Sequence, residues 1–180
     1  MTLSIGRSPG RPSASRVGIY SRLILPCLLA AACRSGGARA SVAATDTTFA
    51  QMQSRGKEAM GVDQYTSSHQ FDDLPDGGRI ELQRDSTDTA GVRTIRDHLR
   101  HIALAFREGD FSLPGFVHAE KVPGTAVMTA NRALITYEFR PLSGGGEVLL
   151  RSSDSTSVSA IHAFLAFQRQ DHHAGGMVHQ

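Results

Sequence analysis

The sequence predicts an α+β fold in which two ββα repeats form a four-stranded antiparallel sheet with two helices on one face. The first observation behind this prediction is an internal similarity between residues 71–82 and residues 139–150. Phenylalanine, leucine, a pair of glycines and alternating aliphatic side chains recur in register in the two stretches. The second observation is that a polar segment and then an apolar pattern of helical period follow each stretch. Because an isolated hairpin is marginally stable in water, the two halves are expected to share one core.

The strands are predicted from the short β-prone runs on either side of each glycine pair. Glycines between two such runs are typical of a hairpin turn. We therefore expect the first hairpin to pair residues 65–71 with 79–84, and the second to pair residues 133–140 with 147–151.

The helices are predicted from apolar side chains spaced three and four residues apart. One helix is expected over residues 89–107 and ends near Gly109, a residue suited to a helix C-cap. A second helix is expected over residues 156–172. The two stripes consist of Val92, Ile95, Leu99, Ile102 and Phe106 in the first helix and of Val158, Ile161, Leu165 and Gln168 in the second.

The stretch between the two halves, residues 110–132, is the least regular part of the domain. It holds two Pro-Gly pairs and too many apolar residues for a disordered segment. Long loops without regular structure are usually functional. We therefore predict an ordered flap that packs across the sheet or the helix ends, within a single domain of residues 61–176 followed by a tail at 177–180.

The first 40 residues have the composition of a secretory signal peptide. They contain six arginines, no acidic residue and an uncharged apolar stretch of about ten residues, too short to cross a bilayer as a helix. The sequence is compatible with two alternative cleavage sites at the end of this leader. Cleavage after Ala40 leaves an unmodified Ser41, whereas a lipobox that ends at Cys33 leaves a lipidated cysteine. Either alternative predicts export by a bacterium, to the periplasm or as a lipid-anchored protein, with residues 41–60 as a linker.

Removal of the leader changes the charge and the thiol content of the chain. The formal net charge falls from +2 to −4, because 13 Lys and Arg then face 17 Asp and Glu. We therefore expect no nucleic-acid partner. Both cysteines precede Ser41, so thiol catalysis, thiolate metal sites and internal disulfides are excluded for the mature domain.

The candidates for metal binding or general-base catalysis in the mature domain are among its eight histidines. His98 and His101 lie three residues apart on the first predicted helix, within reach of one metal ion. With His118 from the flap they form a candidate site for a divalent transition metal such as copper, zinc or nickel. His118, with Glu120 nearby, is also the best candidate for a general base. The sequence has no nucleophile elbow, dinucleotide-binding glycine motif or P-loop.

Several short motifs in the domain resemble a family of small exported bacterial proteins of uncharacterised function. The likeness covers about residues 57–175 and supports the domain limits and export, without implying an activity. The motifs are MGVDQ at 60–64, GG at 77–78, IRDHL at 95–99, GDF at 109–111, PG at 123–124, IHAFLAFQ at 161–168 and DH at 171–172.

These observations lead to two hypotheses of function from different classes. The first is a non-enzymatic domain that binds a small ligand, a metal or an envelope partner through the flap and the helix ends. The alternative is a small periplasmic hydrolase or metal-dependent enzyme that uses His98, His101 and His118.

Overall fold

The computed structural model describes residues 37–174, with side chains described from residue 47. Residues 1–36 of the predicted signal peptide, including Cys33, lie outside this range, as does the predicted tail. Within it, no helix combines the length and the apolar character that a membrane span needs.

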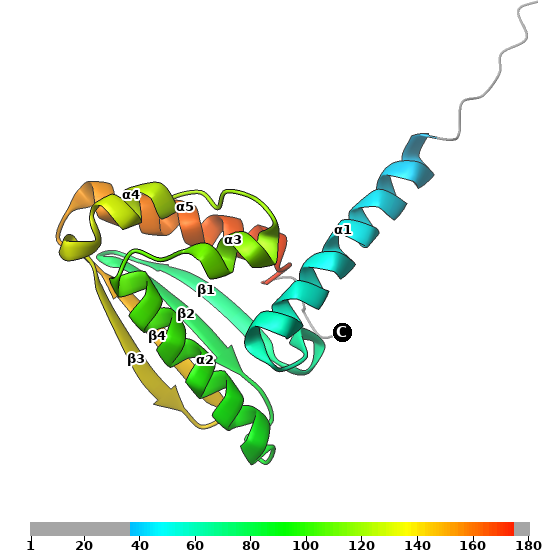
Figure 1. Cartoon of the computed structure of the whole chain (residues 1–180), viewed down its shortest axis with the longest axis horizontal. Coiled ribbons are helices and arrows are strands. Elements are labelled where there is room, and N and C mark those ends of the chain that lie inside the picture. The colour runs from blue at the N-terminus through cyan, green and yellow to red at the C-terminus, as the bar shows by residue number, and fades with distance from the viewer. Residues whose placement is uncertain (1–36, 175–180) are drawn as a thin grey trace, which may run out of the picture. The chain divides into compact units, whose positions relative to one another are not determined.

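The core of the fold is a four-stranded antiparallel sheet with the strand order β1-β2-β4-β3 (Figure 1). The strands are β1 (Ser68–Leu74), β2 (Gly77–Gln83), β3 (Thr136–Leu142) and β4 (Gly145–Arg151). The two hairpins meet through β2 and β4, where Ile80 lies opposite Val148. The predicted four-stranded sheet is thus confirmed.

The glycine pairs lie inside the strands, whereas the sequence analysis placed them at the turns. The turns are the residue pairs that precede them, Pro75-Asp76 and Ser143-Gly144. Gly78 lets helix α5 (Ser155–Asp171) approach the sheet, because a Cβ atom there would lie 2.1 Å from Leu165 Cδ1. Gly77 and Gly145 face neighbouring strands, where a Cβ atom would lie 1.9 Å from Leu150 O and 2.1 Å from Leu82 O. The strands therefore begin and end up to three residues away from their predicted limits.

Helices α2 (Thr89–Arg107) and α5 (Ser155–Asp171) have nearly the predicted bounds. Each begins at an aspartate whose side chain accepts a hydrogen bond from a backbone N–H in the first turn, at Asp88 and Asp154. Helix α2 packs on β3 and β4, and α5 packs on β1 and β2 (Figure 1). The α+β fold with both helices on one face of the sheet is confirmed.

Residues 41–60, predicted to be a linker, belong to helix α1 (Gly37–Met60). Its C-terminal half packs on the domain through Met52, Gln53, Gly56 and Met60, which are all buried. The prediction was wrong because two of these four residues are a glutamine and a glycine, so the buried side of the helix does not form an apolar stripe.

Residues 110–132, predicted to be an irregular flap, contain two short helices. These are α3 (Ser112–His118) and α4 (Thr125–Ala130). Two one-turn 3₁₀ helices, η1 (Gln64–Thr66) and η2 (Arg132–Leu134), lead into β1 and β3. Pro114 lies in the first turn of α3, where backbone N–H groups have no partner within the helix, so a proline is tolerated there. Helix α3 contacts α1, and α4 contacts α5.

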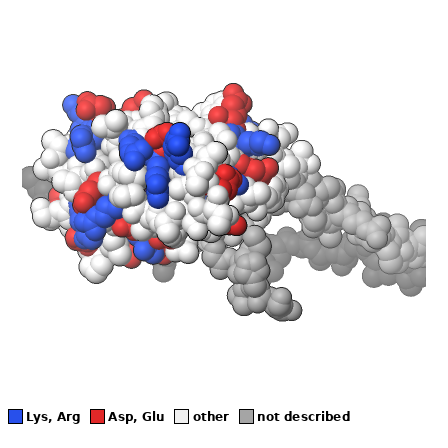
Figure 2. Space-filling model, turned by 90° about the horizontal axis from the view of Figure 1, so that it is seen from below, with Lys and Arg blue, Asp and Glu red and all other residues white. Residues whose placement is uncertain are grey.

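The face of the sheet opposite α2 and α5 carries charged side chains. The Arg79 guanidinium donates from Nε to Asp72 at 3.0 Å and lies 3.2 Å from Glu81 and 3.7 Å from Glu147. Figure 2 shows basic and acidic side chains interspersed over the side of the molecule that it presents. Because positive and negative side chains are mixed there, that side has no extended electrostatic potential of one sign.

Candidate functional site

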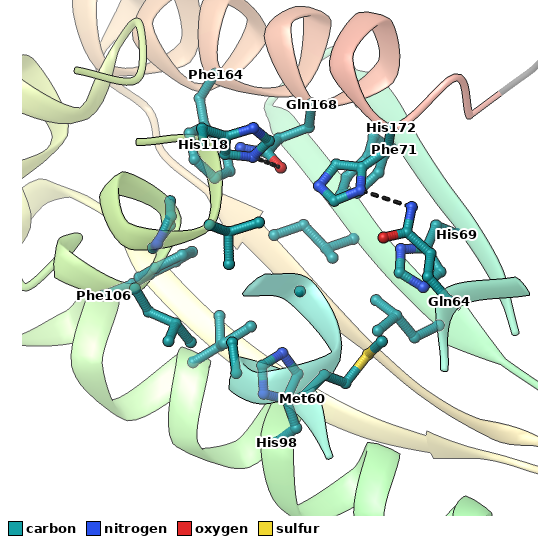
Figure 3. A pocket seen from close by; sticks show the side chains of 18 residues that line it. Met60, Gln64, His69, Phe71, His98, Phe106, His118, Phe164, Gln168 and His172 are labelled. Atoms are coloured by element: carbon teal, nitrogen blue, oxygen red, sulfur yellow. Dashed lines mark hydrogen bonds between the residues drawn. The ribbon is translucent and has the colours of Figure 1, made fainter. Parts of the chain in front are cut away.

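A cavity of about 80 Å³ lies between the sheet and the helices (Figure 3). Its walls are mainly apolar, but six side chains with hydrogen-bonding groups also face it: four histidines and two glutamines. The apolar lining includes Met60, Phe71, Ile80, Leu82, Ile102, Phe106, Val117 and Phe164, and the polar lining consists of Gln64, His69, His98, His118, Gln168 and His172.

Helix α1 supplies one wall of this cavity through Gly56, Ala59 and Met60. The helix is held in place from two sides. Arg55 Nε donates to the carbonyl oxygen of Val117 in α3 at 2.7 Å, and the Phe49 ring stacks on His173 at a centroid distance of 4.2 Å. The segment predicted to be a linker therefore closes the site.

His118 is the most strongly bonded polar group at the cavity. Its Nδ1 pairs with the Asp171 carboxylate, and its Nε2 lies 3.1 Å from Gln168 Oε1. A carboxylate only accepts hydrogen bonds, so Nδ1 is the donor in the pair with Asp171. Because the ring is held on both sides and its side chain is only 1% exposed, His118 is a fixed part of the wall.

The neighbouring wall is formed by His172 and His69. His172 Nδ1 accepts a hydrogen bond from Gln64 Nε2 at 2.8 Å, and His69 Nε2 lies 3.1 Å from Ser67 Oγ. The rings of His118 and His172 have centroids 5.0 Å apart, and those of His172 and His69 are 5.6 Å apart. Three imidazoles from α3, β1 and the end of α5 thus lie in a row (Figure 3).

Burial keeps three of the cavity histidines uncharged at neutral pH. Desolvation, with a smaller contribution from neighbouring imidazoles, lowers the pKa of His69 and of His98 to about 4 and that of His172 to about 3. At pH 7 these side chains are neutral hydrogen-bonding groups.

Two buried amide atoms at the cavity have no partner within residues 37–174. Gln64 uses its Nε2 on His172, and its Oε1 accepts nothing; Gln168 uses its Oε1 on His118, and its Nε2 donates to nothing. The two side chains are 9% and 5% exposed. A buried polar atom without a partner costs about 1–3 kcal/mol, so these atoms mark where a bound molecule gains hydrogen bonds.

The structure separates the three histidines of the predicted metal site. His98 and His118 line the same cavity, but His98 projects from α2 on the side away from His118 and Gln168, and His101 is exposed. In the part of the chain that the structure describes, no three His, Cys, Asp or Glu side chains are placed to share a metal ion. Binding of a divalent transition metal by this protein stays a prediction. Asp171, rather than Glu120, is the carboxylate paired with His118.

Sequence reasoning did not identify His69, His172, Gln64 and Asp171 as part of a site. The sequence suggests that Asp171, His172 and His173 form a second histidine cluster on an exposed tail, able to bind metal only nonspecifically, yet Asp171 and His172 are half-buried. One signal was available: Gln168 occupies an apolar-stripe position of its helix. A glutamine on a buried stripe indicates a polar partner or a ligand inside the core.

Comparison of the chain with models of known protein families, with curated proteins and with solved structures finds no match.

Proposed function

We propose that this chain is a binding domain for a small, uncharged organic ligand held in the cavity between α1, the sheet and α5. A ligand site is usually an apolar concavity with a few convergent polar groups. The single observation that carries the proposal is that the only unpartnered amide atoms of Gln64 and Gln168, two buried side chains from distant parts of the chain, meet at this cavity.

The size of the cavity limits the ligand. Because about 10–15 Å³ of cavity volume is enough for one water molecule, about 80 Å³ has room for several waters or for an organic molecule of about five or more non-hydrogen atoms. A larger ligand requires movement of a wall. Helix α1 packs mainly on α3, α2 and η1 rather than on the strands, so it is the wall that we expect to yield.

Xenon tests whether the cavity admits a guest, because xenon enters apolar cavities without forming hydrogen bonds. We expect xenon to shift the methyl resonances of Met60 and Ile102, measured by NMR. Gly56→Ala should weaken this effect, since the new Cβ atom lies 3.4 Å from Gln64 Oε1 and 4.0 Å from Val117 Cγ1, within the cavity wall.

Gly115→Ala is the matched control. Gly115 is also helical, its Cβ atom would meet only Glu120 O at 3.7 Å, and the residue does not line the cavity. Xenon shifts that are absent in the wild type, or equally strong in wild type and Gly56→Ala, contradict the proposal.

The proposal includes export, which rests on the composition of residues 1–40. Mass spectrometry of the mature protein from a bacterial host tests it. The expected N-terminus is either acylated Cys33 or unmodified Ser41, and an intact leader on the mature protein contradicts export.

A second candidate function, acid–base catalysis, is favoured by the pair of the buried His118 and the half-buried Asp171. A histidine held by a carboxylate is a common arrangement for proton transfer. Hydrolysis of methyl acetate, a probe matched to the cavity volume, tests this candidate. Loss of turnover in His118→Gln with retention in His101→Gln supports catalysis in the cavity, whereas equal loss in both supports the site predicted from sequence. No turnover by the wild type contradicts both.

A further inference from the structure

We infer that the ligand of this cavity carries an uncharged carboxamide group, whose N–H donates to Gln64 Oε1 and whose carbonyl oxygen accepts from Gln168 Nε2. This inference rests on the proposed function and names the class of molecule that the site selects. The argument uses the hydrogen-bonding capacity, the charge and the spacing of the lining groups.

The hydrogen-bonding capacity of the two glutamines is half used within the protein. Each has one amide atom bound to a histidine and the other atom free at the cavity. The free atoms differ in kind: Oε1 of Gln64 only accepts, and Nε2 of Gln168 only donates. A ligand that satisfies both therefore needs one donor and one acceptor.

The bonds to the histidines leave amide atoms of opposite kind free. His118 Nδ1 is paired with the Asp171 carboxylate, and its Nε2 lies 3.1 Å from Gln168 Oε1. His172, uncharged at neutral pH, accepts from Gln64 Nε2. One acceptor, Gln64 Oε1, and one donor, Gln168 Nε2, therefore remain at the cavity.

The charge of the lining excludes an ionised ligand. None of the 18 lining residues is a lysine, arginine, aspartate or glutamate. His118 is paired with the Asp171 carboxylate, and the other three cavity histidines are neutral at pH 7. A carboxylate or an ammonium group would enter without a counter-charge, at a large desolvation cost.

The two glutamines come from different elements, η1 and α5, and are anchored to rings whose centroids are 5.0 Å apart (Figure 3). A ligand with its donor and its acceptor on separate atoms suits two such groups. The nitrogen and oxygen of a carboxamide are separate atoms held in one plane, with an apolar tail free to contact Met60 and Phe106.

Four probes of nearly equal size test this inference: propionamide, 2-butanone, 2-butanol and propionate. Each has about five non-hydrogen atoms, which suits the cavity volume. Titration at pH 7 with NMR detection gives a Kd for each. We expect propionamide to bind about tenfold more tightly than 2-butanone, which lacks the donor and leaves Gln64 Oε1 unpaired. We expect propionate to bind at least as weakly as 2-butanone.

Two variants and one matched control assign the selectivity to the glutamines. Gln64→Met should bring the affinities for propionamide and 2-butanone within about twofold of each other, because it removes the acceptor that only propionamide uses. Gln168→Met removes the donor that both carbonyl groups use, so it should weaken both probes and leave the ratio of their affinities unchanged. Gln53→Met is the control: Gln53 is a buried glutamine of α1, 7% exposed, whose Oε1 also has no partner within residues 37–174, yet it does not line the cavity. It should keep the wild-type preference.

The outcomes separate this inference from the proposed function. If xenon enters the cavity but propionamide binds no better than 2-butanone or 2-butanol, the carboxamide class is wrong and the binding domain stands. If neither xenon nor any probe perturbs the cavity residues, both fail. An unchanged preference for propionamide in Gln64→Met, or an unchanged affinity for propionamide in Gln168→Met, also overturns the inference, provided that the variants unfold cooperatively.

Discussion

Acidification should destabilise this domain more steeply than the titration of its carboxylates alone can explain. The folded state lowers the pKa of His69 and His98 to about 4 and that of His172 to about 3, against an ordinary value of 6.5. The unfolded chain therefore binds more protons between these values. Stability is fully present above pH 6.5 and falls as the pH decreases toward 4.

The size of the effect follows from proton linkage. At pH 5 each of the three side chains is about 97% protonated in the unfolded chain and about 10% or less in the folded one, so unfolding takes up almost three protons. Between pH 7 and pH 5 each histidine then removes about 2 kcal/mol from the free energy of unfolding, and the three together about 4–6 kcal/mol. For a domain of ordinary stability, about 5–15 kcal/mol, this is a large fraction.

Urea denaturation at closely spaced pH values measures the effect. The slope of the unfolding free energy against pH gives the number of protons taken up. His98→Gln should lower that number at pH 5 by about one, whereas His101→Gln, at an exposed position, should leave the contribution of the three cavity histidines in place. An uptake of fewer than one proton by the wild type at pH 5 refutes the description of His69, His98 and His172 as neutral, buried groups.

Three further predictions concern packing and the site. Leu99→Ala, at a position with 0% exposure, should lower the free energy of unfolding by about 2–5 kcal/mol in urea denaturation, whereas Leu104→Ala, at 58% exposure, should change it by about 0.5 kcal/mol or less. Gly124→Ala should cost about 2–4 kcal/mol in the same assay, because Gly124 has a φ of +80° and its Cβ atom would lie 2.1 Å from a backbone carbonyl oxygen of α5. Asp171→Asn should weaken propionamide binding about tenfold while xenon uptake is retained, because it removes the carboxylate that holds the His118 ring against which Gln168 is oriented. An unchanged propionamide affinity in that variant would show that Asp171 does not contribute to ligand binding.

The fold was predictable because its apolar residues follow a clear period. Val92, Ile95, Leu99 and Phe106 face the core on one side of α2, and all four are buried. The hairpins were predictable from their glycines, but the strand limits were not. Gly78 and Gly146 are needed for close approach of the helices rather than for the turns, and the sequence alone does not separate the two reasons.

The site was less predictable because tertiary contacts assemble it. His118 and Asp171 are 53 residues apart in the sequence, and Gln64 and His172 are 108 residues apart. No local spacing rule connects such pairs. Helix α1 was missed for a related reason, since it packs through Gln53 and Gly56 as well as through methionines and has no apolar stripe of its own. The HxxH spacing of His98 and His101 drew attention to a helix face of which only His98 lines the cavity.

The position of a bound xenon atom tests the central claim, a ligand site between α1 and the sheet, most directly. In crystals of the domain under xenon pressure, we expect anomalous density bounded by Met60, Ile102, Phe106 and Val117, and weaker density at that place in Gly56→Ala. Density elsewhere in the molecule, with none between α1 and the sheet, would contradict the claim.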